Sequence, residues 1–229
     1  MMRYYTALGR YELRTNEQGL QQPVLKAGRR EYEPTVNEML LWSMLLWKIR
    51  EPRELRKSFE EKLAEMHSWE EYSFEYYLNR LEKLGFLRSG TGYTAVDALY
   101  ALVSPLYLIP VEPGIGAKIL AFIKMIFVRG IPIRQALRVF SRQKLSQKEQ
   151  AVLGLITQND LSTAELICCV DQGLTNVRHD ETILDNLYDD PAVSCDELPG
   201  AARVSCQMIP ILQAVTDLYL RRMIVFEMY

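Results

Sequence analysis

Residues 78–95 of the chain read LNRLEKLGFLRSGTGYTA, and the pattern changes from helix to strand at Gly85. Before this glycine, apolar residues recur at a spacing of three and four, which predicts the buried face of a helix. A glycine directly after such a stripe often ends a helix. After Gly85, residues 86–88 and 93–96 predict two short strands, and the glycine-rich residues 89–92 predict the turn between them.

Two helices are predicted upstream of this stretch. Thr35 and Glu38 have the spacing of a capping box, and the apolar run 36–49 that follows predicts a buried helix. Pro52 suits the first turn of a second helix, which is amphipathic. The chain therefore reaches residues 78–95 with two helices already formed.

A third helix and a leading hairpin complete this region. Ser68 and Glu71 form another capping box, which predicts that the helix containing Leu78 spans residues 68–84. Near the start of the sequence, the tyrosine-rich residues 3–14 and the apolar residues 23–25 predict a short hairpin.

Residues 35–96, with three helices followed by a hairpin, resemble bacterial winged-helix domains. The resemblance implies a fold superfamily, and members of one superfamily have many functions. Together with the leading hairpin, the region is also similar to winged-helix domains that bind the leader peptides of ribosomally made peptide products. That second resemblance implies peptide binding.

The last part of the chain repeats the order of helices followed by a strand. Capping pairs that open short helices are Ser146 with Glu149 and Ser162 with Glu165. A helix is predicted at 183–188, and a polar loop continues from there to about residue 203. The apolar stripe of residues 206–220 predicts a last helix, and the β-rich residues 223–226 follow it. This order predicts a degenerate second winged-helix copy, in which strand 223–226 takes its partner from elsewhere.

The predicted fold is mainly α with short β-hairpins, an α+β fold of tandem winged-helix-like domains joined by a helical connector. The N-terminal winged-helix-like domain with its leading hairpin spans residues 1–112. A basic helical connector spans residues 113–145, and an acidic C-terminal domain spans residues 146–229.

Charge is distributed unevenly, although the formal net charge is only −2. The connector has seven Lys and Arg residues and no acid, whereas residues 146–229 have five basic and 13 acidic residues. A stripe of cations predicts contacts with nucleic-acid phosphates. The predicted contact residues are Lys118, Lys124, Arg129, Arg134, Arg138, Arg142, Arg203, Arg221 and Arg222. The same cations could instead pair with the acidic C-terminal domain, which would leave little charge for DNA.

Two predicted helices have the position of a recognition helix. Residues 68–84 carry four acidic and two basic residues, which disfavours docking against phosphates. Residues 206–220 are nearly neutral and have arginines on their flanks, so this helix is the better predicted reader of DNA. A cluster of aromatic residues covers more than one face of helix 68–84, so we expect some in the core and one or two at the surface, where they would stack on bases or bind a peptide. The cluster consists of Trp69, Tyr72, Phe74, Tyr76 and Tyr77.

No constellation of catalytic groups is evident in the sequence. The histidines, His67 and His179, lie in different predicted domains without a nucleophile motif nearby. The string Gly114-Ile-Gly-Ala-Lys118 has Ile119 where a phosphate loop needs Ser or Thr. The four cysteines lack the C-x-x-C spacing of a tetrahedral metal site. We therefore expect a protein that is not an enzyme, has reduced thiols and binds no cofactor or metal.

The location and the function follow as expectations. No secretory signal pattern and no apolar run of membrane-spanning length is found, so we expect a cytoplasmic protein. The leading hypothesis is a transcriptional regulator that binds double-stranded DNA as a homodimer. The alternative is a protein- or peptide-binding adaptor that uses a winged-helix scaffold without DNA. An open face of cations favours the regulator, and cations held in ion pairs favour the adaptor.

Overall fold

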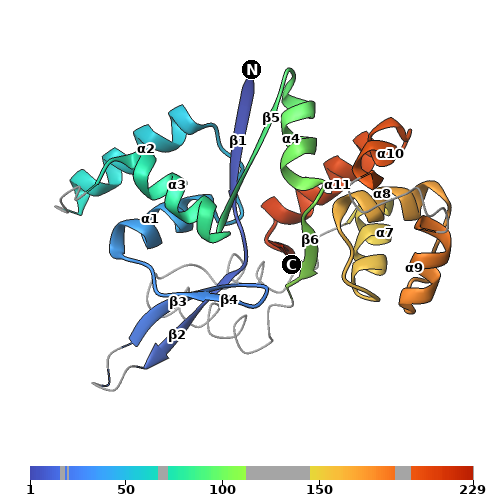
Figure 1. Cartoon of the computed structure of the whole chain (residues 1–229), viewed down its shortest axis with the longest axis horizontal. Helices are drawn as coiled ribbons and strands as arrows, with labels where there is room; N and C mark the ends of the chain where they lie inside the picture. The colour runs from blue at the N-terminus through green and yellow to red at the C-terminus, as the bar shows by residue number, and fades with distance from the viewer. Residues whose placement is uncertain (16–18, 20, 67–71, 112–144, 189–196, 229) are drawn as a thin grey trace, which may run out of the picture.

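The fold is α+β, as the sequence predicts, with helices and small antiparallel sheets (Figure 1). The computed structural model describes residues 1–15, 19, 21–66, 72–111, 145–188 and 197–228. Within these ranges, no helix is both long and apolar enough to cross a membrane.

A two-stranded antiparallel sheet organises the first half of the chain. β1 (Met2–Ala7) pairs along its whole length with β5 (Leu87–Gly92). β5 leads directly into α4 (Ala95–Val103), which begins with a capping box formed by Thr94 and Asp97. The partner of β5 is thus the first strand of the chain.

The hairpin predicted at residues 86–96 is wrong, because its glycines have another role. Gly90 and Gly92 lie inside β5, where α4 packs against the strand. A Cβ atom at Gly90 would collide with the backbone of Ala98 and of Leu102. Glycine therefore allows a close approach of helix and strand here and does not reverse the chain.

The first two helices confirm the predictions from their capping patterns. α1 (Val36–Leu45) begins with the capping box of Thr35 and Glu38. α2 (Pro52–Glu65) has Pro52 at its first position. Both starts depend on contacts between residues close in sequence, which explains why a sequence pattern finds them.

The third helix is shorter than predicted. α3 (Phe74–Leu84) is capped by the side chain of Ser73, and it ends at Gly85 with a φ of 80°. The predicted capping box of Ser68 and Glu71 lies outside the described residues. The predicted end of the helix is confirmed, whereas its start at Phe74 lies closer to the C-terminus than the predicted start.

The leading hairpin is confirmed in part. β2 (Arg10–Thr15) and β3 (Gln21–Ala27) form an antiparallel pair, and β4 (Arg30–Tyr32) adds a short third strand on the other side of β3. The predicted single strand at residues 3–14 is divided at Gly9, whose φ is 76°. The part before Gly9 belongs to β1.

The first strand of the second half lies before residue 112, so the predicted domain boundary assigns it to the N-terminal domain. β6 (Tyr107–Pro110) pairs antiparallel with β7 (Ile224–Glu227), which is the last strand of the chain. β6 supplies the partner that residues 223–226 were expected to find elsewhere. The pairing therefore crosses the boundary predicted at residue 112.

Five helices of the second half lie within the described residues. α7 (Gln147–Ile156) and α8 (Thr163–Asp171) begin with the predicted capping boxes. α9 (Asp180–Leu187) and α11 (Met208–Leu220) lie close to their predicted positions. α10 (Leu198–Val204) lies where the sequence predicts a polar loop, so that prediction is wrong. A proline in its first turn, a position that favours proline, is consistent with a helix start there.

The two halves share one order of elements. In the first, β1 precedes α1, α2, α3 and β5, with β2, β3 and β4 inserted before α1. In the second, β6 precedes α7, α8, α11 and β7, with α9 and α10 inserted before α11. Each first strand also forms one bridge just before the second helix, at Tyr5 with Arg50 and at Tyr107 with Ser162. Each pair of strands brings the start and the end of its own half together.

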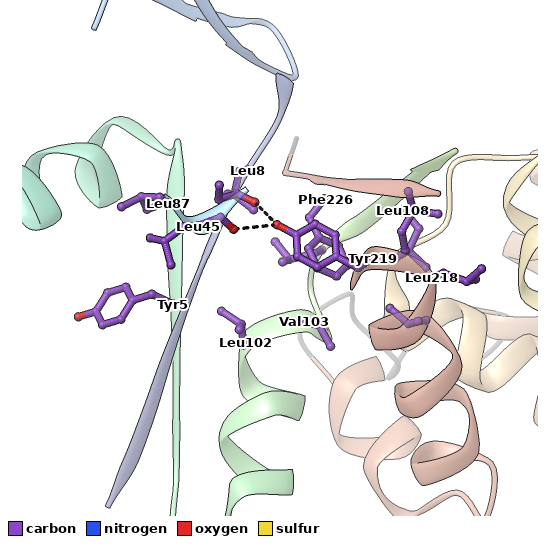
Figure 2. Close-up of a cluster of buried hydrophobic side chains, with 14 of the residues drawn as sticks. Tyr5, Leu8, Leu45, Leu87, Leu102, Val103, Leu108, Leu218, Tyr219 and Phe226 are labelled. Atoms are coloured by element: carbon purple, nitrogen blue, oxygen red, sulfur yellow. Dashed lines mark hydrogen bonds between the residues drawn. The ribbon is translucent and has the colours of Figure 1, made fainter. Parts of the chain in front are cut away.

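Tyr219 of α11 joins the two halves. Its hydroxyl accepts hydrogen bonds from Thr6 Oγ1 at 2.8 Å and from the Trp47 backbone N–H at 2.9 Å. It also lies 3.3 Å from the carbonyl oxygens of Ala7 and Leu45, to which it can donate. Figure 2 shows the Tyr219 ring pointing from α11 toward Leu45 of the first half. Burial raises the pKa of this hydroxyl to about 12, so it stays a donor at neutral pH.

Further contacts continue this junction along β7. The Trp47 indole donates to the Ile224 carbonyl at 3.1 Å, and the Gly9 backbone N–H donates to the Phe226 carbonyl at 2.7 Å. The rings of Tyr219 and Phe226 stack with their centroids 4.2 Å apart. Buried apolar residues of both halves consequently form one continuous core.

Replacement of the junction hydroxyl is expected to destabilise the fold. Tyr219→Phe leaves the partly buried Trp47 N–H without its acceptor, which should lower the free energy of unfolding by about 1–3 kcal/mol. Urea unfolding at neutral pH measures this difference. Tyr93→Phe is the matched control, because Tyr93 is 89% exposed and should change stability by less than about 0.5 kcal/mol. Equal stability of the two variants would contradict a structural role for the hydroxyl.

Candidate interaction surface on helix α3

Most of the predicted phosphate contacts lie outside the described residues. These are Lys118, Lys124, Arg129, Arg134, Arg138 and Arg142. The other three, Arg203, Arg221 and Arg222, lie on α10 or directly after α11. Each of the three contacts a side chain elsewhere in the protein.

Arg203 and Arg221 form ion pairs. Arg203 pairs with Asp97 in the first turn of α4, and hydrogen bonds from Thr94 and Arg203 lower the pKa of this carboxyl group. Arg221 Nη1 lies 2.9 Å from Oε1 of Glu149, whose side chain is buried. Both guanidinium groups therefore stabilise contacts within the protein.

Arg222 and α11 also contribute to the junction. The guanidinium of Arg222 lies 5.5 Å from the centroid of the Trp47 ring, in a cation–π contact. The apolar stripe of α11 is buried, and the large apolar side chains that it exposes are Ile209 and Leu220. This helix, which the sequence favours as the reader of DNA, packs in the core and presents no cationic face.

α3 has an outward face of polar and aromatic side chains. Its inward residues Phe74, Tyr77, Leu78 and Leu81 are buried. The outward residues follow helical spacing on the opposite side and, with Tyr72 just before the helix, form what we call the α3 face. The α3 face consists of Tyr72, Tyr76, Asn79, Arg80 and Lys83, all of them exposed.

The acidic residues of α3 are paired at its flanks. Glu75 forms an ion pair with Arg56 of α2, and Glu82 forms one with Arg3 of β1 at 3.4 Å. The helix begins at Phe74, so the acids at positions 70 and 71 precede it. Within the described residues, the two acids of α3 are therefore held in ion pairs beside the α3 face.

Two tyrosines form the aromatic part of the α3 face. The rings of Tyr72 and Tyr76 stack with centroids 4.4 Å apart, and the residues are 47% and 38% exposed. Phe74 and Tyr77 are buried, as expected for part of the predicted aromatic cluster, while Trp69 lies outside the described residues. The sequence pattern names the cluster, but helix packing decides which rings reach the surface.

A buried carboxylate positions Arg80. Arg80 Nη1 donates to the Tyr76 hydroxyl at 2.8 Å, and Arg80 Nε lies 3.0 Å from Glu38 Oε1. Glu38 also accepts hydrogen bonds from the Tyr32 hydroxyl and from the Thr35 backbone N–H, each at 2.8 Å. Burial and the bond to Glu38 raise the pKa of Tyr32, so its hydroxyl remains a donor. Arg80 is thus ordered before any partner binds.

The rest of the described structure offers little catalytic chemistry. A hollow of about 290 Å³ near Trp47, Ile109 and Val225 is lined largely by apolar side chains. Burial raises the pKa of Cys168 to about 11 and that of Cys169 to about 12, which disfavours their thiolate forms. Among the described residues, no group of three or more His, Cys, Asp or Glu side chains could hold a metal ion.

Comparison of the chain with protein-family models, curated proteins and solved structures gave no match. The resemblance to winged-helix domains consequently stays a prediction.

Loss of the Glu38 carboxylate should destabilise α1 and release Arg80. Glu38→Ala removes half of a capping box and the acceptor for Tyr32, so the free energy of unfolding should fall by about 2–3 kcal/mol. Thermal and urea unfolding measure the loss. Glu33→Ala, at an exposed position nearby, is the control and should be close to neutral. Similar losses in both variants would show that Glu38 does not support this surface.

Proposed function

We propose that this protein is a non-enzymatic adaptor that binds a partner polypeptide through the α3 face. The observation that carries the proposal is the exposed stack of Tyr72 and Tyr76 beside Arg80, which a buried carboxylate holds in place. Tyrosine and arginine are enriched among the residues that dominate binding at protein interfaces. Because these side chains are already ordered, little conformational entropy is lost on binding.

The same scaffold is proposed to be a tandem of winged-helix-like halves. The shared order of elements and the matching bridges of Tyr5 with Arg50 and Tyr107 with Ser162 support a second, degenerate copy. The copies differ in the side chains that they expose, because α3 presents Tyr76 and Arg80, whereas α11 exposes Ile209, Gln213 and Leu220. We therefore expect each chain to have one interaction helix, α3.

A DNA-binding regulator is the second candidate. It rests on the seven cations and the absence of acids in residues 113–145. Against it, Arg203, Arg221 and Arg222 have partners within the protein. In addition, β5 continues into α4 and provides no wing hairpin beside α3. These observations favour the adaptor.

Site-specific crosslinking tests the adaptor proposal in cells. A photoreactive residue placed at Asn79 should crosslink a defined polypeptide, because this position lies in the middle of the α3 face. The same residue placed at Gln213, an exposed position on α11, is the matched control and should not crosslink that polypeptide. Mass spectrometry identifies the product, and Tyr76→Ala should reduce its yield.

Titration with the identified polypeptide then measures the contribution of the α3 face. Tyr76→Ala should weaken binding about 10- to 30-fold, as for a residue at the centre of an interface. Tyr93→Ala, on the exposed turn after β5, should bind like the wild type. Crosslinks from Asn79 to nucleic acid, together with selection of particular DNA fragments at physiological salt, would reject the adaptor and support the regulator.

A further inference from the structure

β2 is an exposed edge strand. It pairs with β3 on one side, and no strand within the described residues pairs with its other side. Five of its six residues are exposed, and Glu12 is partly exposed. An edge of this kind offers a row of backbone N–H and C=O groups to another strand.

The side chains of β2 differ between its two faces. Arg10, Glu12 and Arg14 alternate with Tyr11 and Leu13, so one face is charged and the other is mainly apolar. Tyr11 and Leu13 are 48% and 57% exposed. A partner strand must therefore present opposite charges on one face and apolar groups on the other.

The charged face is already ordered within the sheet. Lys26 Nζ lies 2.7 Å from Glu12 Oε2, and Arg14 Nη2 lies 2.7 Å from Glu31 Oε1. The bond to Lys26 lowers the pKa of Glu12. A carboxylate and a guanidinium have further hydrogen-bonding capacity, so each can take a second partner across the edge.

We propose that two copies of the chain pair antiparallel through their β2 edges, about a twofold axis at Leu13. In this register Leu13 lies opposite Leu13 of the second copy, and Tyr11 lies opposite Thr15. Glu12 lies opposite Arg14, and this charge pair occurs twice because of the symmetry. The partner of the edge is thus a second copy of this chain.

The charge pattern selects this register. Directly opposite residues must share a face, so the twofold axis has to pass through one residue of the strand. An axis at Glu12 would place two carboxylates opposite each other and Arg10 opposite Arg14, which is unfavourable. An axis at Tyr11 would require Leu8 and Gly9, but Leu8 is buried and the Gly9 N–H is bonded to Phe226. The register at Leu13 avoids both conflicts.

The dimer is independent of the α3 face. The α3 face is formed by α3 and residue 72, whereas the proposed contact uses only the outer edge of β2. Five residues on each side, 11–15, form a small interface, so association should be weak and depend on concentration. Each dimer would carry two α3 faces, and failure of dimerisation would leave the adaptor proposal untouched.

Complementary charge variants test the pairing. Wild-type protein should shift from monomer to dimer with increasing concentration in analytical ultracentrifugation. Glu12→Arg and Arg14→Glu each place like charges opposite one another, so each variant alone should remain monomeric. An equimolar mixture of the two restores opposite charges at both sites and should form a heterodimer at wild-type concentrations. Circular dichroism verifies that both variants are folded.

Cysteine crosslinking tests the register. Leu13→Cys should form a disulfide-linked dimer on mild oxidation, because residue 13 faces its own copy. Thr15→Cys, two residues away on the same face, is the control and should not, because it faces Tyr11. Peptide mapping separates these products from those of the exposed native Cys206.

Wild-type protein that stays monomeric at all concentrations would overturn the proposal. A dimer that persists in both single charge variants, or a mixture that fails to associate, would also overturn it. Equal crosslinking at positions 13 and 15 would reject the register.

Discussion

The hydroxyl of Tyr219 is the contact on which the arrangement of the two halves depends. It lies where β1 and α1 end. There it accepts from the Trp47 backbone N–H and lies 3.3 Å from the carbonyl oxygens of Ala7 and Leu45, and the Leu45 carbonyl also accepts from the Lys48 N–H. A polar group removed from water without a hydrogen bond is costly, so the Trp47 N–H needs an acceptor. The second half supplies it from the last turn of α11. Apolar packing around this hydroxyl then excludes water from the junction.

This junction determines which surfaces remain free. α11 has its apolar stripe in the common core, and arginines near its ends contact Asp97, Glu149 and Trp47. These three arginines, which are the described members of the predicted nucleic-acid contacts, therefore have partners within the protein. α3 lies away from the junction, and its outward side chains remain available. α3 and α11 thus differ both in their packing and in the side chains that they expose.

Order at the α3 face comes from the carboxylate beneath it. Glu38 caps α1 and, through the same side chain, binds Tyr32 and Arg80. One buried group thereby connects the start of a helix with the surface that we propose for binding. The β2 edge has a different character, because its exposed backbone and alternating charges invite a strand rather than a side-chain contact.

The sequence alone determined the features that depend on neighbours in the chain. Helix starts at Thr35, Ser146 and Ser162 follow from capping residues three positions apart, and the end of α3 follows from Gly85. It also named the aromatic cluster that contributes to the α3 face. Only the tertiary structure decided the strand partners, the exposed tyrosines, the ion pairs of the arginines and the role of Gly90, because each depends on residues far apart in sequence. A local pattern of polarity and spacing does not identify the distant segment that it will contact, since many segments of a chain fit the same pattern.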